Sequence, residues 1–270
     1  MPLFSAVAPL PANRIKNRLF DPDARDYILR VEAADGERLE SQVRGAINDF
    51  VLGCKADGIW TSLVTSCIMA GARTVAGAIT PLVGNAPTNN NFVAGDYSRT
   101  LGLLGNGTNK YLATGYNNND NTTFPQNDSH MSCYVSASQT NTSGILVGTT
   151  FGLGNRFSFY YALSTQISTR NRATTASTLS IAPIGFQGNT RNNVSNFSRR
   201  FTTASGISNA SVTINSGQGT NELFGVFASG AGTFFSAARM SFYSIGKSLT
   251  LSSLDSRITT LMTTLASVIA

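Results

Sequence analysis

The spacing of apolar residues changes near Gly71, and this change constrains the fold more than any other feature of the sequence. Before Gly71, apolar residues recur every three or four positions, which is the spacing of one face of a helix. After it, short alternating runs are separated by Gly, Asn, Ser and Thr. Alternation with a period of two is typical of strands with one buried face. The chain therefore divides into a helical beginning and a longer β-rich part.

The helical beginning is predicted to contain three helices after an N-terminal arm. Residues 1–20 carry prolines and then basic residues, which predicts an extended arm or, in a free monomer, a partly disordered terminus. Asp21 and Pro22 suit the start of a helix, and Gly36 suits its end. A second helix is predicted over about residues 37–55, with charged residues on one face. A third is predicted over residues 60–70.

A β-sandwich is predicted over residues 72–248. Residues 74–83 are apolar and contain Pro81, which suits an edge strand, and residues 86–91 are predicted to be a loop. Apolar and polar residues alternate over residues 130–137. Turns rich in Asn, Gly and Ser at intervals of roughly 10–20 residues are typical of two packed sheets. Further strands are predicted at 144–150, 157–163, 179–186, 197–203, 210–215, 222–228 and 239–243.

Residues 95–112, with the sequence GDYSRTLGLLGNGTNKYL, join the two parts. The runs 101–104 and 110–112 are predicted to be paired strands, and Gly105, Asn106 and Gly107 suit the tight turn between them. We therefore expect this hairpin to begin the sandwich.

A helical pattern returns over residues 249–270. Its apolar residues alternate steps of three and four, the spacing of an a/d seam. They are Leu251, Leu254, Ile258, Leu261, Leu265 and Val268. Ser, Thr and Ala fill the positions at which a coiled coil carries charged pairs, and the pattern is shorter than three heptads. We expect this helix to pack on its own domain, with an oligomer seam as the alternative.

The net charge of +6 arises from a shortage of acids rather than from a basic patch. Residues 1–60 hold eight Lys/Arg and nine Asp/Glu, whereas residues 61–270 hold twelve and five. The basic residues of the second part are scattered, so no stripe that could follow phosphates is evident. Residues 58–72 are uncharged but too short and too polar to span a bilayer. We expect neither a nucleic-acid partner nor insertion into a membrane.

Catalytic motifs are not evident in the sequence. The β-rich part holds only five acids, Asp96, Asp120, Asp128, Glu222 and Asp255. A glycoside hydrolase needs two carboxyl groups on opposite sides of its cleft. No two of these five acids lie close in the sequence, so such a pair would form only if folding brought Asp120 and Glu222 together. The single histidine, His130, lies three residues before Cys133, which places the two on opposite faces of a strand. We expect His130 to be an exposed polar residue and the protein not to be an enzyme.

The three cysteines, Cys54, Cys67 and Cys133, each lie among apolar residues. An odd count without a CxxC motif favours buried free thiols over disulfides or a metal site. The sequence also lacks a phosphate-binding loop and a complete dinucleotide fingerprint. We expect no cofactor and no metal ion.

The remaining candidate site is a loop rich in amides. It combines an aromatic ring with neighbouring amide groups, a set that can stack on a sugar ring and hydrogen-bond its hydroxyls. The candidate glycan-binding residues are Tyr116, Asn117, Asn118, Asn119 and Asp120. The alternative is that the asparagines serve the geometry of a turn.

Three segments of the sequence together resemble a family of bacteriophage virion proteins. They are VEAADGERLESQVRGAINDFVLGCKADGIW at 31–60, APTNNNFVAGDYSRTLGLLGNGTNKYL at 86–112 and ARMSFYSIGKSLTLSSLDSRITTLM at 238–262. Such proteins carry a concanavalin A-like or laminin G-like jelly roll and are known as phage structural or tail proteins. The resemblance covers about residues 25–265, and it is the combination of the three segments that is specific.

The resemblance implies a mainly β protein: a concanavalin A-like jelly-roll β-sandwich at 72–248, preceded by the arm at 1–20 and a helical segment at 21–71, and closed by a C-terminal helix at 249–270. It also implies a virion protein, made in the cytoplasm of the bacterial host and displayed on the particle as a tail fibre, tail appendage or head decoration. Its partners would be other virion proteins of the capsid or tail.

Proteins of this kind are often homo-oligomers, so the resemblance also makes an oligomer such as a homotrimer an expectation. An alternative function is a host-receptor module of the tail that binds surface polysaccharide. Metal-dependent lectins of this fold use clustered acids and a histidine for Ca²⁺ or Mn²⁺, and this sequence lacks that set. Sugar binding through a metal ion is therefore not expected.

Overall fold

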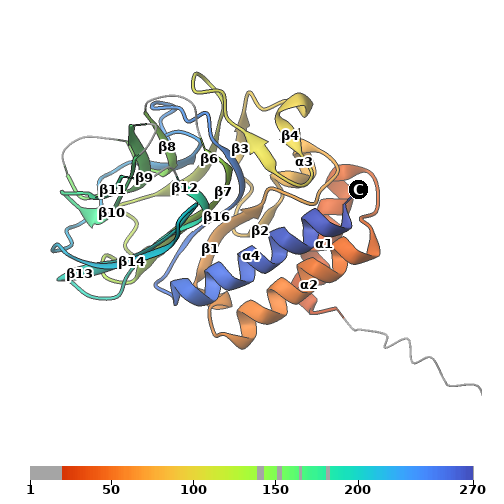
Figure 1. The fold of residues 1–270 in the computed structure, drawn as a ribbon, viewed down its shortest axis with the longest axis horizontal. Coiled ribbons are helices and arrows are strands. Elements are labelled where there is room, and N and C mark those ends of the chain that lie inside the picture. Colours follow the sequence, from red (N-terminus) through yellow and green to blue (C-terminus); the bar gives the residue numbers. More distant parts are fainter. Residues whose placement is uncertain (1–19, 139–142, 151–153, 164–165, 181–182, 270) are drawn as a thin grey trace, which may run out of the picture.

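Two antiparallel β-sheets pack face to face, and helices cover one of them (Figure 1). The structure is a computed structural model that describes residues 20–138, 143–150, 154–163, 166–180 and 183–269. The predicted fold class, a β-sandwich preceded by helices and closed by a C-terminal helix, is confirmed. The predicted arm at 1–20 lies outside the described residues except for Phe20.

Sheet A is the sheet that the helices cover. Its strands are β1 (Leu63–Ile68), β2 (Pro81–Val83), β4 (Tyr97–Ser98), β5 (Gly102–Leu104), β7 (Ser129–Ala137), β12 (Pro183–Arg191), β13 (Asn196–Thr203), β14 (Gly206–Thr213) and β16 (Arg239–Gly246). Their order is β14-β13-β12-β7-β16-β1-β2, and β5 pairs with β16 and β4 beside this path. Strand β2, which contains Pro81, lies at the edge as predicted, but it covers only the end of the predicted run at 74–83, because residues 75–78 form a short helix instead.

Sheet B forms the second layer. Its strands are β3 (Thr88–Asn90), β6 (Tyr111–Asn117), β8 (Gly144–Gly148), β9 (Arg156–Leu163), β10 (Gln166–Ala173), β11 (Ser177–Leu179) and β15 (Leu223–Val226). Their order is β11-β10-β9-β8-β15-β6-β3. Strands distant in the sequence are therefore neighbours, and both sheets depend on long-range pairing.

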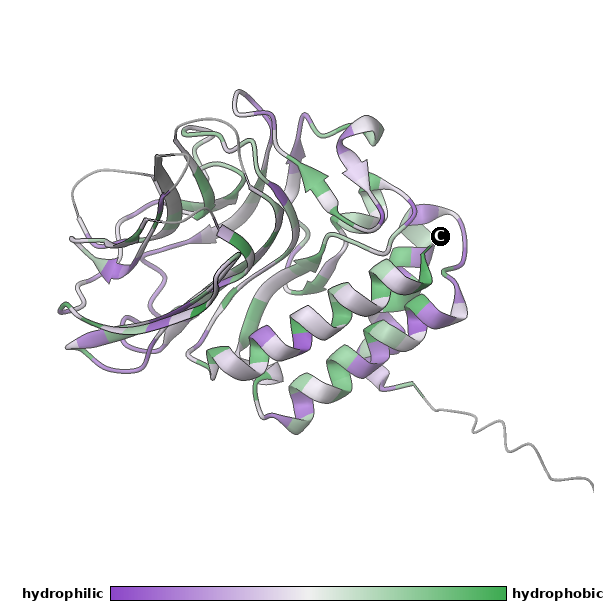
Figure 2. Ribbon diagram, viewed as in Figure 1, coloured by the Kyte–Doolittle hydropathy of each residue, from purple (hydrophilic) through white to green (hydrophobic). Residues whose placement is uncertain are grey.

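The long helices begin and end close to where the sequence places them. The helices are α1 (Pro22–Asp35), α2 (Ser41–Ala56), α3 (Val75–Ala78) and α4 (Leu251–Val268). Helix α1 begins where the Asp21 side chain accepts a hydrogen bond from the Asp23 amide at 3.0 Å, and it ends at Gly36, whose φ is 70°. Helix α2 begins at Ser41, a few residues later than predicted. Figure 2 shows hydrophobic and hydrophilic residues alternating along α2 and α4, as expected for helices with one apolar face.

The molecule has two apolar cores, one on each side of sheet A. Between the helices and sheet A, the rings of Phe50 and Phe242 meet edge to face with centroids 5.9 Å apart. Five of the six predicted apolar residues of α4 are buried in this core, so the helix packs on its own domain. The second core lies between the sheets, where Met131, Cys133 and Val135 of β7 point inward. The predicted alternation of β7 is confirmed.

The predicted third helix at 60–70 is wrong. Only a short 3₁₀ turn forms, η1 (Trp60–Ser62), and β1 follows it immediately. Strand β1 lies between β16 and β2 and is buried on both faces. A strand that is covered on both sides needs apolar residues at consecutive positions, so the period of two disappears and the run resembles a buried helix.

The predicted hairpin within residues 95–112 is also wrong, because its two strands belong to different sheets. Strand β5 pairs with β16 and β4 in sheet A, whereas β6 pairs with β15 and β3 in sheet B. The turn itself exists: Asn106 Oδ1 accepts hydrogen bonds from the amides of Thr108, Asn109 and Lys110 at 3.0–3.1 Å. The turn redirects the chain locally, but the partners of each strand are decided by distant segments.

Other strand boundaries differ in smaller ways. Residues 88–90 form β3 within the predicted loop at 86–91, and the run at 179–186 contributes to both β11 and β12. Strand β10, with the sequence QISTRNRA, was not predicted at all. Its residues are mostly buried although several are polar, so it shows no apolar alternation. The reason is a layer of polar contacts between the sheets, described below.

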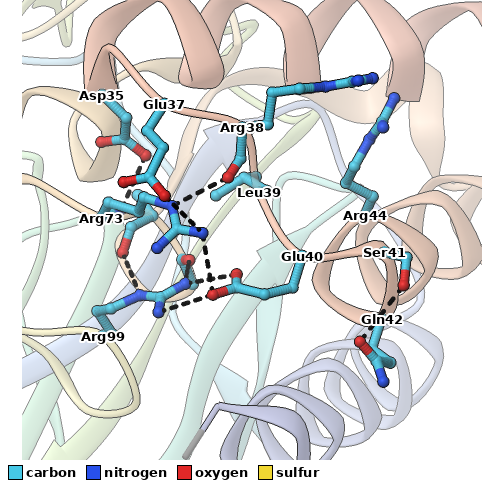
Figure 3. A network of polar contacts seen from close by, with 12 residues as sticks. Asp35, Glu37, Arg38, Leu39, Glu40, Ser41, Gln42, Arg44, Arg73 and Arg99 are labelled. Atoms are coloured by element: carbon cyan, nitrogen blue, oxygen red, sulfur yellow. Dashed lines mark hydrogen bonds and ion pairs between the residues drawn. The ribbon is translucent and has the colours of Figure 1, made fainter.

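A cluster of ion pairs joins the helices to the sandwich (Figure 3). Arg99, just after β4, donates Nη1 to Glu40 Oε1 at 3.1 Å and Nη2 to Glu40 Oε2 at 2.8 Å. Arg73, just before α3, donates its amide to Asp35 Oδ2 at 2.7 Å and also contacts Glu37 and Glu40. The connection between α1 and α2 is thereby tied to two loops of the sandwich. The Arg99 guanidinium lowers the pKa of Glu40 to about 2.

Candidate functional site

The predicted glycan-binding residues lie together where β6 ends. The half-buried ring of Tyr116 meets Phe124 edge to face with centroids 5.6 Å apart, and its hydroxyl accepts a hydrogen bond from the Asn85 amide at 3.3 Å. Asn117 Nδ2 donates to Asn221 Oδ1 at 2.8 Å. Tyr116 and Asn117 thus contact other loops of the protein.

The rest of this loop is held by hydrogen bonds within the loop and to neighbouring segments. Asn118 is fully buried, and its Nδ2 donates to Asn155 O at 3.1 Å and to Thr220 Oγ1 at 3.2 Å. The half-buried Asn119 donates its amide to Asn117 Oδ1 at 3.1 Å. Hydrogen bonds from Thr123 lower the pKa of the Asp120 carboxyl below its usual value. The structure brings the five residues together, but much of their hydrogen-bonding capacity is used inside the protein, as the turn alternative requires.

A second candidate lies on the outer face of sheet A, beyond the end of the helical cover. A cavity of about 490 Å³ opens between β13, β14 and the first turn of α4. We call it the outer groove. Its polar lining includes Ser198, Arg200, Asn209, Ser211, Thr250 and Ser252. Such a lining offers hydroxyl, amide and guanidinium groups to a polar ligand.

The geometry of the outer groove follows from strand register. Strands β13 and β14 pair Arg200 with Asn209 and Ser198 with Ser211, so these four side chains share one face. Arg200 donates Nε to Asp255 Oδ2 on α4 at 2.7 Å and Nη1 to Asn209 Oδ1 at 3.2 Å. Arg200 therefore anchors α4 to the sheet. This site was not predicted from the sequence, although the alternation of Phe197 and Phe201 with polar residues was a usable signal.

A buried polar layer fills part of the space between the sheets. Asn171 Nδ2 donates to Asn189 Oδ1 at 3.0 Å, and Ser129 Oγ donates to Asn171 Oδ1 at 2.9 Å. Arg191 is fully buried, with Nε donating to Asn171 O at 3.0 Å and the other nitrogens donating to loop carbonyls, among them Ile214 O at 3.0 Å. Burial lowers the pKa of Arg191 to about 10. These contacts hold loops in place and explain why β10 lacks apolar alternation.

His130 is buried, so its predicted exposure is wrong. Its Nδ1 lies 2.5 Å from Lys247 O, and its Nε2 lies 2.9 Å from Ser244 Oγ. A carbonyl can only accept, so we assign the proton to Nδ1 and the acceptor role to Nε2. Burial lowers the pKa of His130 to about 4. Residues 244–247, which return along β16, cover the start of β7, and the local sequence does not reveal this.

The cysteines are buried free thiols, as predicted. Burial raises the pKa of Cys54 and of Cys67 to about 12, which leaves both as unreactive thiols at neutral pH. In the part of the chain that the structure describes, no group of three or more His, Cys, Asp and Glu could hold a metal ion. Among the same residues, the helices are too short or too polar to cross a bilayer.

The acids of the β-rich part are engaged in structural contacts. Asp96 pairs with Lys110, and Glu222 pairs with Arg156. Asp128 Oδ1 accepts a hydrogen bond from the Ser248 amide at 2.7 Å. Asp120 accepts a hydrogen bond from the Thr123 amide, and Asp255 pairs with Arg200. Each of the five carboxyl groups therefore contacts another part of the protein.

No family model matches the chain, and no curated protein matches it in sequence. Solved structures with distant similarity include an arabinofuranosidase complexed with arabinofuranosyl-α-1,2-xylobiose, with 12% identity and a TM-score of 0.42 over 58% of this chain and 41% of that chain. The binding domain of botulinum neurotoxin serotype D matches with 10% identity and a TM-score of 0.43, over 74% of this chain and 50% of the other.

A mutant of Trypanosoma rangeli sialidase that displays trans-sialidase activity has 11% identity and a TM-score of 0.47, over 82% of this chain and 39% of the sialidase. The chain thus spans half or less of the length of these three proteins. At these identities and TM-scores the similarities are distant, and no activity follows from them.

Proposed function

We propose that the protein is a non-enzymatic structural protein of a bacteriophage particle, displayed on its surface as a tail appendage or a head decoration. The observation that carries the proposal is the way in which the three segments that resemble phage virion proteins come together in space. They lie at 31–60, 86–112 and 238–262. Other virion proteins of the capsid or tail would be its partners.

These segments form one body at the helix-covered side of the molecule (Figure 1). The first includes α2, which packs against α4 of the third segment. The third also includes β16, which pairs with β5 of the second segment. The pair of Glu40 and Arg99 links the first segment to the second. Three parts of the chain that are distant in the sequence thus build a single platform.

The end of the molecule away from α1 and α2 consists of strands that lie outside these segments, among them β8 to β11, β13 and β14 (Figure 1). In our proposal the platform faces the particle and these strands face outward. The described chain also begins on the platform side, where Arg44 lies over the ring of Phe20 at 5.3 Å from its centroid. The structural use of the carboxyl groups and the burial of His130 support a role without catalysis.

Mass spectrometry of purified phage particles tests the proposal directly. We expect the protein in the particles at a constant ratio to the major capsid protein, and its absence from purified particles would overturn the proposal. Antibodies test the orientation: one against the exposed turn of the β13–β14 hairpin, at residues 204–205, should label intact particles. An antibody against the exposed side of α4, which carries Ser256, Thr259 and Thr263, should bind the isolated protein but should not label intact particles.

The outer groove favours a second candidate function, a polysaccharide-binding module of the tail. Its hydroxyl and amide groups suit sugar hydroxyls, and Asn209 and Ser211 are both exposed. Binding of the isolated protein to host cell-wall polysaccharide tests this. The double variant Asn209→Ala/Ser211→Ala should lose binding if the groove is the site. The matched variant Asn117→Ala/Asn119→Ala tests the loop at 116–120, and an inert wild-type protein at millimolar sugar would leave only the architectural role.

A further inference from the structure

Strand β14 differs from the other strands that end a sheet in the described part of the chain. Strands β2, β3 and β11 have three residues each, and β4 has two. Strand β14 has eight residues and contains neither proline nor a charged residue. It pairs with β13 over its whole length without a shift of register, so it carries no bulge. It is therefore the one long and regular edge among them.

An edge strand exposes a row of backbone N–H and C=O groups that can pair with another strand. Proteins protect such edges by shortness, proline, charge or bulges, because an unprotected edge is a template for association. The other edges are protected by their shortness, and β2 also contains Pro81. Strand β14 has none of these protections, which marks it as an interaction surface.

The direction of the free backbone groups follows from the hairpin. Residues 204 and 205 form the turn, so Thr203 and Gly206 close the hairpin and exchange both backbone hydrogen bonds. Bonded and non-bonded pairs then alternate along the ladder. Gly206, Ser208, Ala210 and Val212 direct their backbone groups to β13. Ile207, Asn209, Ser211 and Thr213 direct theirs away from the sheet.

We propose that β14 pairs with β14 of a second copy of this chain, antiparallel and about a two-fold axis at Ala210. This register places Ile207 opposite Thr213 and Asn209 opposite Ser211, which are the residues with outward backbone groups. The two strands then exchange about eight backbone hydrogen bonds. A register centred on a neighbouring residue leaves one end of the strand unpaired and forms fewer.

The chemistry of the strand fits a second copy. A strand without charge meets itself without repulsion, whereas like charges directly opposite one another destabilise a sheet. Ile207 is 54% exposed, and in this register the methyl group of Thr213 covers it. On the same face, the amide of Asn209 lies opposite the hydroxyl of Ser211. Each cross-strand pair therefore matches in polarity or in apolar contact.

The pairing closes as a dimer. A trimer would need β14 to pair with a different edge of the next copy, and the other edges offer only two or three residues. A two-fold axis perpendicular to the sheet keeps both outer grooves on one face of a continuous sheet. The proposal therefore replaces the trimer that the family resemblance implies with a two-fold dimer.

The test is sedimentation velocity of the full chain over a series of concentrations, with the variants Ser211→Pro and Ser211→Ala. Proline removes the Ser211 N–H, which points away from β13, so the hairpin keeps its own hydrogen bonds. The substitution acts twice in the dimer. We expect dimerisation to weaken by more than about tenfold in Ser211→Pro. Ser211→Ala keeps the N–H and should dimerise like the wild type.

Hydrogen exchange provides a second measurement. The amides of Asn209 and Ser211 should become protected as the dimer forms, whereas those of Ser208 and Ala210 should be protected at every concentration. The proposal is overturned by a wild-type protein that stays monomeric throughout the series or forms a trimer. It is also overturned by a folded Ser211→Pro variant that dimerises like the wild type, or by a dimer that leaves Asn209 and Ser211 exchanging freely.

Discussion

The outer face of sheet A has two halves: one is apolar and covered by helices, and the other is polar and uncovered. One half, over β1, β16 and β7, lies under the helices and contributes Ile68 and Phe242 to an apolar core. The other half, over β13 and β14, lies beyond the helices and carries Ser198, Asn209 and Ser211 (Figure 1). The two halves belong to one continuous sheet. Coverage by the helices, rather than strand geometry, distinguishes them.

The boundary between the halves follows β12. A Cβ atom added at Gly188 would lie 2.5 Å from the Phe186 ring and 2.9 Å from Leu251 Cδ2. The absence of a side chain at Gly188 thus lets the start of α4 approach the sheet, and Arg200 holds the next turn through Asp255. The helical layer therefore ends near Gly188 and the ion pair of Arg200 and Asp255, and the outer groove begins there.

Truncation of Phe242 should have the largest effect on stability, because it removes a core side chain from the half of sheet A that the helices cover. Phe242 is fully buried and contacts the ring of Phe50. We expect Phe242→Ala to lower the free energy of unfolding by about 3–5 kcal/mol, through lost burial and the cavity left behind. The matched variant in the uncovered half over β13 and β14, Asn209→Ala, should change the free energy of unfolding by less than about 0.5 kcal/mol. Urea unfolding measures both, and equal losses would contradict the comparison.

His130 should make the covered half sensitive to acid. Its pKa is about 4 in the folded protein and 6.5 in its ordinary state, so the unfolded chain binds the proton more readily. The stability it contributes is complete above about pH 6.5 and is lost as the pH falls toward 4, by up to about 3 kcal/mol. The measurement is urea unfolding at a series of pH values.

The control is His130→Asn, whose amide can still donate to Lys247 O. This variant should be less stable than the wild type at neutral pH, but its stability should vary less between pH 6.5 and 4. A wild-type protein with constant stability in that window would contradict the burial of a neutral His130.

The join between the helices and the sandwich should have the smallest of the three effects. Arg99 holds the pKa of Glu40 at about 2, below its ordinary 4.5. The stability from this pair is complete above about pH 4.5 and is lost as the pH falls toward 2. The Glu40 side chain is 33% exposed, and solvent screening limits the loss in Glu40→Gln at neutral pH to about 1–2 kcal/mol.

Glu37 offers a matched control for Glu40, because it contacts Arg73 but its side chain is 66% exposed. Glu37→Gln should leave the free energy of unfolding nearly unchanged. The difference between wild type and Glu40→Gln should shrink as the pH approaches 2. A difference that persists unchanged at pH 2 would mean that packing, rather than the ion pair, holds this join.

Local signals in the sequence were sufficient where one face of an element is buried and the other is exposed. Asp21, Pro22 and Gly36 define the ends of α1 through capping and a left-handed backbone. The spacing from Leu251 to Leu265 defines α4 and its buried face. Strand β7 is a partial exception: its polar side is largely buried as well, yet the alternation of Met131 and Cys133 with polar residues still identified the side that faces the core between the sheets.

The same signals failed where an element is covered on both sides. Residues 63–68 lost the period of two because β1 is buried on both faces, so the run resembled a helix. Strand β10 lost it because Asn171 belongs to a buried polar layer. His130 seemed exposed because the segment that covers it returns more than a hundred residues later, at Lys247. The predicted glycan-binding residues lie together, but Asn118 points inward and donates to Thr220.

The sequence by itself determined the ends of α1, the extent and buried face of α4, the turn at Asn106 and the small number of acids in the β-rich part. Only the tertiary structure decided that β5 and β6 belong to different sheets, that α4 ends its cover of sheet A near Gly188, and that β14 is left as a long open edge. The physical reason is range. Capping, turns and periodicity depend on neighbouring residues, whereas strand partners and the coverage of a face depend on contacts between segments that are distant in the sequence.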